Sequence, residues 1–554
     1  MFAQVSTVAF LGIDARPVDV QVQIGAGLPS FSIVGLPDKA VAESRERVRA
    51  ALSSIGLGLP AKRITINLAP AGLPKEGSHY DLAVAVGLMI ACGAMPGDEI
   101  ADYVVIGELG LDASVAPIAG CLPAAIGANA MGKGLICPFA CGAEAVWASP
   151  DMPILAPPHL LSLVNHFKGL VSLARPVARL DTGTRETLDL RDVRGQEMAK
   201  RAVEIAAAGG HHLLMTGPPG AGKSMLAQRL PGLLPPLEPA EMLEVSMIQS
   251  MAGQLASGQL SRKRPFRAPH HSASMAALVG GGSRPRPGEV ALAHHGVLFL
   301  DELPEFTAQV IDALRQPLEA GEMVIARANH RIAYPTRFQL VAAMNPCRCG
   351  RAGEPGFSCR QGTNCQDRYL ARLSGPILDR IDIRIGVPPV TAADLALPPA
   401  LEGSAEVRVR VAEARRRQRQ RYQALGSPKL AVNAECPAAL LEEVAKPDAA
   451  GEKLLQDAAA AFGLTARGYH RTLRLARTLA DLDAEDRVRP VHVAEALAFR
   501  GEGIGETGSR QVQPRAQPRL HPVNGIHAPA ASSLLPAPLV GEGGCLRRRD
   551  QKNA

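Results

Sequence analysis

The sequence predicts an α/β protein of several domains, and three patterns support this prediction. Short strands alternate with helices through about the first 175 residues, an apolar strand leads through a glycine-rich loop into a helix at 211–230, and helical patterns continue from about 404 to 500. Alternating strands and helices imply a parallel sheet flanked by helices. The length of 554 residues is enough for two to four domains.

Composition places the chain among ordinary globular proteins. Hydrophobic residues make up 47% of it, as in a typical soluble domain. No apolar run approaches the ~20 residues of a membrane-spanning helix. The first residues lack the basic segment and cleavage pattern of a signal peptide. We therefore expect a cytoplasmic protein that does not enter a membrane.

The charge balance and the aromatic content restrict the partners. The net charge is +7 and the isoelectric point is about 8.9, which is compatible with a polyanionic partner. Aromatic residues amount to only 3%, too few for a surface built on base stacking. Contact with nucleic acid is expected through phosphates. Ten cysteines without a secretion signal do not predict a disulfide framework.

Local patterns divide the chain into domains. Residues 18–24 and 63–70 are predicted strands, and 38–57 and 81–93 are predicted helices. A polar stretch at 174–196 is typical of a linker, and the Gly-, Pro-, Arg- and Gln-rich segment from 501 predicts a disordered tail. The predicted boundaries are 1–175 for the N-terminal domain, 176–195 for the linker, 196–395 for a second α/β domain, 396–500 for a helical domain and 501–554 for the tail.

The strongest motif is a phosphate-binding loop between a strand and a helix. Its glycines let backbone N–H groups surround phosphates, and the following helix N-terminus favours negative charge. We expect Lys223 to bind the β- and γ-phosphates of ATP and Ser224 to ligate Mg²⁺. The loop consists of Gly217, Pro218, Pro219, Gly220, Ala221, Gly222, Lys223 and Ser224.

Two further apolar strands end in residues suited to ATP hydrolysis. The segment 296–302 ends in adjacent carboxylates, with Asp301 predicted to hold the magnesium ion and Glu302 to activate the attacking water. The segment 338–346 ends in Asn345, whose amide can position that water. The alternative for Asn345 is a residue that simply begins a turn before Pro346.

Two arginines are candidates for contact with the nucleotide. Arg380 lies too far along the chain to complete its own site easily, but in a ring it can reach the γ-phosphate of a neighbouring subunit. The alternative is a surface ion pair with Asp379 or Asp382. Arg467, in the predicted helical domain, is our choice for a residue that senses the bound nucleotide.

Four cysteines lie within a short stretch that follows Asn345. Thiolates at this density suit tetrahedral Zn²⁺, and the intervening segment has too little apolar content to fold unaided. The alternatives are free cysteines, or ligation by the histidine pairs at 270–271 and 294–295. The four candidate zinc ligands are Cys347, Cys349, Cys359 and Cys365.

Several segments together resemble a known family. GPPGAGKS, RPFRAPHHSAS (264–274), GEVALAHHGVLFLDELPEF (288–306), MNPCRCG (344–350) and LSGPILDRIDI (373–383) resemble the YifB/ComM magnesium-chelatase-like AAA+ proteins over about residues 1–500. The resemblance implies an AAA+ P-loop NTPase core with an α-helical C-terminal lid, in which Asn345 is sensor 1 and Arg380 the arginine finger.

The resemblance also implies an activity and partners. Proteins of the ComM type are hexameric branch-migration helicases that act on DNA during natural transformation, and they use ATP and Mg²⁺. Here a helix-2 insert at about 250–290 would carry a basic cluster at 261–267 toward the ring pore. The alternative is that these basic residues form solvated faces. The other functional alternatives are a chelatase-type motor that remodels a protein partner and an ATP-dependent protease.

The N-terminal domain resembles the Lon protease domain, which has the ribosomal S5 domain 2-like fold. In that alignment His79 takes the place of the Lon serine, Ser78 lies one residue early, and Leu122 takes the place of the Lon lysine. A serine nucleophile needs a nearby base, and only Lys75 offers a displaced one. The resemblance therefore implies a non-proteolytic domain used for binding or assembly.

Overall fold

The computed structural model describes residues 1–181, 188–255, 258–282, 286–326, 331–350, 364–396, 398 and 400–500. These residues belong to one compact unit, Met1–Gly505, and the predicted tail from 501 lies outside the described residues. No helix among the described residues is long and apolar enough to cross a membrane.

The N-terminal domain is built on a seven-stranded mixed sheet in the order β3-β4-β2-β1-β5-β8-β9. Strands β1, β2 and β4 pair antiparallel, whereas the remaining neighbours pair parallel. The strands of this sheet are β1 (Phe2–Leu11), β2 (Asp14–Gly25), β3 (Ser30–Val34), β4 (Arg63–Ala69), β5 (Tyr103–Val105), β8 (Gly134–Ile136) and β9 (Ile154–Leu155).

Helices cover this sheet because their apolar residues match its buried face. The Asp38 side chain caps the first N-terminal helix at the Val41 N–H. The second helix packs on β1 and β2 and is buried along nearly its whole length. The helices are α1 (Lys39–Ser54), α2 (Asp81–Ala91), α3 (Gly97–Ile100), α4 (Cys121–Ala130), α5 (Gly142–Ala145) and α6 (Leu160–Phe167), with 3₁₀ turns η1 (Phe139–Cys141) and η2 (Val146–Ala148).

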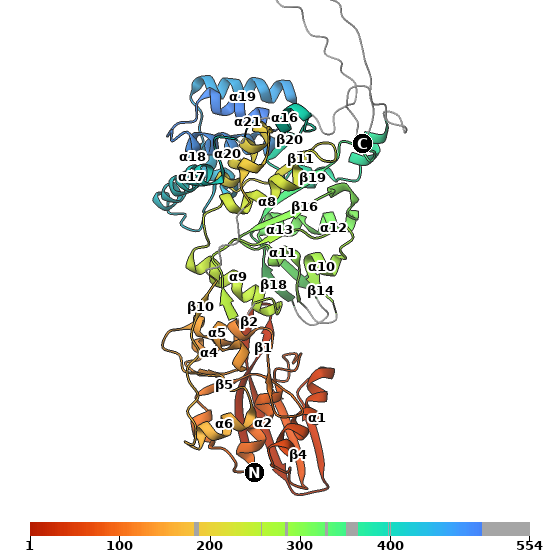
Figure 1. Cartoon of the computed structure of the whole chain (residues 1–554), viewed down its shortest axis with the longest axis vertical. Coiled ribbons are helices and arrows are strands. Elements are labelled where there is room, and N and C mark those ends of the chain that lie inside the picture. The colour runs from red at the N-terminus through yellow and green to blue at the C-terminus, as the bar shows by residue number, and fades with distance from the viewer. Residues whose placement is uncertain are drawn as a thin grey trace, which may run out of the picture. The chain divides into compact units, whose positions relative to one another are not determined.

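A second, fully parallel sheet forms the core of the chain, in the order β13-β16-β19-β11-β20 (Figure 1). Its central strands are apolar without alternation, as expected for a sheet covered on both faces. The strands are β11 (Leu213–Thr216), β13 (Phe266–Arg267), β16 (Val297–Leu300), β19 (Gln339–Met344) and β20 (Ile383–Gly386).

Helices surround the parallel sheet, and short two-stranded pairs lie outside both large sheets. The helices are α7 (Glu197–Gly209), α8 (Lys223–Leu233), α9 (Pro239–Met251), α10 (Met275–Val279), α11 (Glu289–Leu292), α12 (Ala308–Ala313), α13 (Arg315–Ala320), α14 (Asn364–Leu370) and α15 (Gly375–Leu378). The strand pairs are β6 (Glu108–Leu109) with β7 (Val115–Ala116), β10 (Arg179–Leu180) with β12 (Gln259–Leu260), β14 (Gly280–Gly281) with β15 (Arg286–Pro287), and β17 (Glu322–Ala326) with β18 (Arg331–Pro335).

The C-terminal part is helical, and Figure 1 shows its helices, coloured teal to blue, gathered together. Helices α17 and α20 pack on each other and on α7 of the core. The helices are α16 (Ala392–Ala396), α17 (Ser404–Ala424), α18 (Ala438–Val444), α19 (Ala449–Phe462), α20 (Ala466–Leu482) and α21 (Pro490–Ala498). A mixed α/β chain with a parallel sheet and a helical C-terminal region is thus confirmed.

The predicted linker takes part in the packing at both of its described ends. Strand β10 pairs with β12 near its start. Leu190 and Val193, near its end, are buried in the same apolar cluster as the core sheet. The backbone N–H of Leu190 also donates to Ser404 of α17 at 2.8 Å. The polar composition of this segment did not reveal that two apolar residues anchor it.

We predict that the buried ion pair between α1 and α2 holds the N-terminal domain together. Arg47 donates to both carboxylate oxygens of Asp81, at 2.6 and 3.0 Å, and Asp81 is fully buried. Removing the arginine leaves a carboxyl group buried without its partner, so Arg47→Ala should lower the free energy of unfolding by about 3 kcal/mol. Trp147, the only tryptophan, reports unfolding by fluorescence during a urea titration.

Arg45→Ala is the matched control. Arg45 pairs with Glu46 on the exposed side of α1, so its removal should cost less than about 0.5 kcal/mol. Equal effects of the two substitutions would show that the buried pair does not stabilise the domain.

Candidate functional site

The register of the parallel sheet brings three predicted segments to one edge. Thr216 at the end of β11 lies opposite Met344 at the end of β19, and Leu300 at the end of β16 lies opposite Ala342 on that same strand. The residues that follow these strands are therefore neighbours at the carboxyl edge of the sheet. Ligands of open α/β sheets bind at this edge.

Glycine is required at specific positions of the loop after β11. Gly220 and Gly222 have φ values of +78° and +88°, a region that side-chain-bearing residues rarely adopt. A Cβ atom on Gly217 would lie 2.2 Å from the carbonyl oxygen of Val387. The loop therefore turns sharply against β20 and delivers its backbone N–H groups to the start of α8.

Lys223 connects the loop to the end of β19. Its Nζ donates to the carbonyl oxygens of Gly217 and Pro218, at 2.7 and 2.9 Å, and to the Asn345 side-chain oxygen at 3.2 Å. Burial lowers the pKa of the Lys223 ammonium group. These contacts place the predicted phosphate-binding cation and the predicted water-positioning amide side by side.

Ser224 and Asp301 form the second contact across this edge. The Ser224 hydroxyl donates to an Asp301 carboxylate oxygen at 2.7 Å. A hydroxyl and a carboxylate are the oxygen donors that Mg²⁺ takes from a protein while phosphate and water supply the others. These two residues therefore fit a magnesium ion bound together with a nucleotide.

Glu302 has a strained backbone at the start of a 3₁₀ turn. Its φ of 52° and ψ of 45° lie in the left-handed region, which costs free energy for a residue with a side chain and is common at active sites. Its carboxylate lies 3.2 Å from Nδ1 of His271. Sequence reasoning missed this histidine, because nothing in its spacing links it to the end of β16.

The two predicted arginines lie near each other. Arg380 donates to Glu319 and to the carbonyl oxygen of Pro376. Burial and then the nearby Arg467 lower the pKa of Arg380. Among the described residues, neither guanidinium group makes a hydrogen bond to the phosphate-binding loop.

Arg380 does form an ion pair within the chain, but its partner is neither Asp379 nor Asp382. Arg380 pairs with Glu319, on α13. Asp382 instead accepts a hydrogen bond from Arg471 of α20 at 2.8 Å and contacts His211 at 3.3 Å. The carboxylate of Asp382 therefore joins the helical region to the core sheet.

Three of the four predicted zinc ligands come together. The sulfur atoms of Cys347, Cys349 and Cys365 all lie within 4.8 Å of one another, and Cys359 lies outside the described residues. A Cβ on the neighbouring Gly350 would lie 2.9 Å from Pro219. The thiol cluster therefore adjoins the phosphate-binding loop.

The arginines of the predicted basic cluster at 261–267, and those of α17, largely make contacts within the chain. Arg264 donates to Glu241 at 2.9 Å, and Arg267 forms two bonds to Glu289 at 2.6 and 2.7 Å. In α17, Arg415 is buried, and ion pairs within the chain are formed by Arg416, Arg417, Arg419 and Arg421. These guanidinium groups therefore have acidic or backbone partners within the chain.

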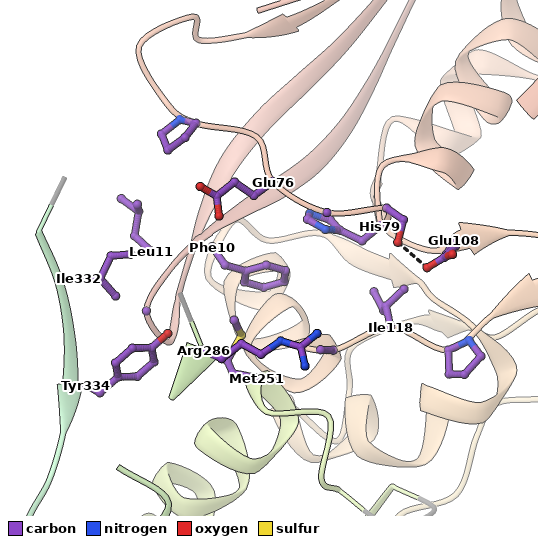
Figure 2. A pocket seen from close by; sticks show the side chains of 16 residues that line it. Phe10, Leu11, Glu76, His79, Glu108, Ile118, Met251, Arg286, Ile332 and Tyr334 are labelled. Carbon is purple, nitrogen blue, oxygen red and sulfur yellow. Dashed lines mark hydrogen bonds between the residues drawn. The ribbon is translucent and has the colours of Figure 1, made fainter. Parts of the chain in front are cut away.

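A cavity of about 340 Å³ is lined by Ser78, His79 and Glu108, among other residues (Figure 2). Ser78 donates its hydroxyl to Glu108, and the ammonium group of Lys75 donates to the Pro70 carbonyl oxygen. The His79 ring contacts the Val8 carbonyl oxygen at 2.9 Å, and burial lowers the pKa of His79 to about 4. The serine and the lysine thus have separate partners.

Comparison with known proteins identifies the family. Residues 189–395 match the magnesium chelatase subunit ChlI model, 20–141 match the subunit ChlI of Mg-chelatase model, and 401–500 match the ChlI C-terminal model. The chain is 42% identical to the uncharacterized protein YifB of Salmonella typhimurium over 90% of its own length and 97% of that protein.

Two further relatives define how far the similarity extends. The chain is 42% identical to the competence protein ComM of Haemophilus influenzae, over 89% of its own length and 96% of that protein. It is 30% identical to the magnesium-chelatase 38 kDa subunit of Rhodobacter capsulatus, over 29% of its own length and 51% of that subunit. Similarity at this level over nearly the whole length, together with the three matching family models, shows that the chain belongs to the YifB/ComM family of magnesium-chelatase-like AAA+ ATPases.

Proposed function

We propose that the chain hydrolyses ATP as a subunit of an AAA+ ring and uses the energy to move on branched or single-stranded DNA. The observation that carries the ATPase part is the pair of contacts Lys223–Asn345 and Ser224–Asp301 across one edge of a parallel sheet. They gather a phosphate-binding cation, two magnesium-ligating oxygens and a water-positioning amide in one place. Glu302, the next residue after Asp301, is the proposed general base.

Each residue has a separate task in this proposal. Lys223 exchanges its carbonyl partners for the β- and γ-phosphate oxygens, while the loop N–H groups surround the same phosphates. Ser224 and Asp301 hold Mg²⁺, which neutralises phosphate charge when bound. Asn345 orients the water, and Glu302 accepts its proton. Arg380 serves the γ-phosphate of the adjacent subunit, and Arg467 is the proposed sensor of the bound nucleotide.

The DNA part of the proposal has its main support in the relationship to the competence protein ComM. The net charge of +7 is compatible with it, although the arginines noted above are used within the chain. A chelatase-type motor that remodels a protein partner is the competing function, because part of the chain is similar to a magnesium-chelatase subunit. The protease alternative is weaker, because Ser78 and Lys75 have separate partners.

We also propose roles for the N-terminal domain and the thiol cluster near the loop. The N-terminal domain is proposed to be a Lon-like scaffold without proteolytic chemistry, used for binding or assembly. Cys347, Cys349 and Cys365, with Cys359 as the fourth ligand, are proposed to bind Zn²⁺ and to fix the segment that follows Asn345.

A DNA-dependent ATPase assay tests the proposed function. The rate of ATP hydrolysis should rise at least about tenfold with a four-way junction, less with single-stranded DNA and least with duplex DNA. The reason is that the proposed motor completes its hydrolysis cycle efficiently only when DNA is bound. Lys223→Ala protein, measured with the same DNAs, controls for contaminating ATPases. A rate that is insensitive to every DNA would refute the DNA part and favour the protein-remodelling alternative.

The arginine finger is tested by mixing two inactive variants. Arg380→Ala should bind ATP normally but hydrolyse it about 10³-fold more slowly, because the γ-phosphate loses a cation supplied by the neighbour. Lys223→Ala subunits retain Arg380, so co-assembled rings contain interfaces with an intact loop and an intact finger. ATPase activity should therefore reappear on mixing. Absence of rescue in rings shown to be mixed would count against action between subunits.

We propose that His271 holds the Glu302 carboxylate away from the attacking water until the ring binds DNA. An ion pair between partly exposed side chains contributes up to about 1 kcal/mol, so His271→Ala should raise the DNA-free kcat by up to about fivefold and leave the KM for ATP unchanged. His270→Ala is the matched control, because His270 contacts Ser272 instead. If the two variants had the same kcat as the unaltered protein, the contact would have no role in turnover.

A further inference from the structure

A second thiol cluster lies in the N-terminal domain, away from the nucleotide edge. It consists of Cys121 at the start of α4, Cys141 at the end of η1 and Glu144 in α5. One sulfur or oxygen atom from each residue lies within 4.8 Å of the other two. All three side chains are buried, with exposed fractions of 0%, 6% and 4%.

The local backbone explains how these groups meet. Cys141 and Glu144 are three residues apart across a turn that runs from η1 into α5, so their side chains lie on the same side. Cys121 reaches them from the neighbouring helix, and its Sγ lies 3.7 Å from the Cys141 carbonyl oxygen. Cys137, directly after β8, is fully buried in the same apolar cluster.

The Glu144 carboxyl group is the feature that a simple core does not explain. Its Oε2 atom is buried and has no hydrogen-bond partner among the described residues. An unpartnered carboxylate oxygen in an apolar interior is costly. A disulfide between Cys121 and Cys141 would remove both thiol donors and leave this oxygen without a partner.

We propose that Cys121, Cys141 and Glu144 bind a zinc ion that cross-links the N-terminal domain, with Cys137, buried in the same apolar cluster, as the candidate fourth ligand. Tetrahedral zinc holds thiolates at about 2.3 Å and carboxylate oxygen at about 2.1 Å, so its ligand atoms are separated by roughly 3.5 to 3.8 Å. Atoms already within 4.8 Å of one another need only small side-chain movements to reach this spacing.

Zinc would supply a positive charge that stabilises the carboxylate formed from Glu144 and the thiolates formed from Cys121 and Cys141. On binding, the two thiol protons and the carboxyl proton leave to solvent and three bonds to the metal form. Two sulfur ligands favour zinc over calcium or magnesium, which prefer oxygen. The site is buried and closed, so its role is structural. It would join α4 to the η1–α5 turn.

The proposed zinc site would also stabilise the contact between the N-terminal domain and α9. Leu122 follows Cys121 and packs with Leu237, Met242 and Val245 in one apolar cluster. Its backbone N–H donates to the Ser250 hydroxyl of α9 at 3.3 Å. Fixing the first turn of α4 therefore fixes the surface that α9 contacts.

The test measures metal in the full chain after the other thiol cluster has been removed. Protein carrying Cys347→Ser and Cys349→Ser, purified with zinc in the medium and without chelator, should contain about one zinc per chain by mass spectrometry, as a closed site requires. Adding Glu144→Gln or Cys141→Ser should lower the zinc content to below about a tenth of that value. Cys92→Ser, which removes a thiol outside the cluster, should leave it unchanged.

Cobalt absorption and tryptophan fluorescence distinguish the loss of a metal ligand from the loss of folding. Cobalt added to the metal-free background protein should produce thiolate-to-cobalt absorption that is lost in Cys141→Ser, and Trp147 fluorescence shows whether each variant has folded. Glu144→Gln preserves the size of the side chain, so it separates loss of a ligand from loss of packing. A background protein without zinc and without cobalt absorption, or a disulfide between Cys121 and Cys141 found by peptide mapping, would overturn the proposal.

Discussion

The parallel register of β11, β16 and β19 is the constraint on which the candidate site depends. Each strand is apolar and buried, so a shift of its register would bury polar residues and move the following loop away from its neighbours. With the observed register, Lys223 meets Asn345 and Ser224 meets Asp301 at hydrogen-bond distance. The chemistry at this edge is therefore a consequence of how the core of the sheet packs.

Much of the nucleotide edge could be predicted from the sequence because its motifs are contiguous. A strand, a glycine-rich loop and a helix form one local unit, and an apolar run that ends in Asp301 and Glu302 has few structural alternatives. The same holds for α1 and α2, whose ends lie within a few residues of those predicted. Local patterns determine these elements, and tertiary packing agrees with them.

Contacts between distant segments could not be predicted in this way. Nothing in the spacing of His271 points to Glu302, and the partner of Arg380 is Glu319 rather than either adjacent aspartate. The basic cluster at 261–267 suggested an open surface, because charge counts do not show which acids lie nearby in space. The sequence of the predicted linker at 176–195 likewise did not indicate that Leu190 is buried in the core.

The two thiol clusters differ in how far the sequence revealed them. Cys347, Cys349 and Cys365 lie close together in the chain, so their clustering was expected. Cys121 and Cys141 come from separate elements and meet only because α4 packs against α5.

The central claim is that this edge of the sheet binds and cleaves ATP, and separate measurements of binding and cleavage in Glu302→Gln protein test it most directly. The account predicts that this variant binds ATP with unchanged affinity and turns it over at least about 10²-fold more slowly, because the water has lost its base. Lys223→Ala should fail to bind the nucleotide at all. Normal turnover by Glu302→Gln protein would contradict the assignment of the site.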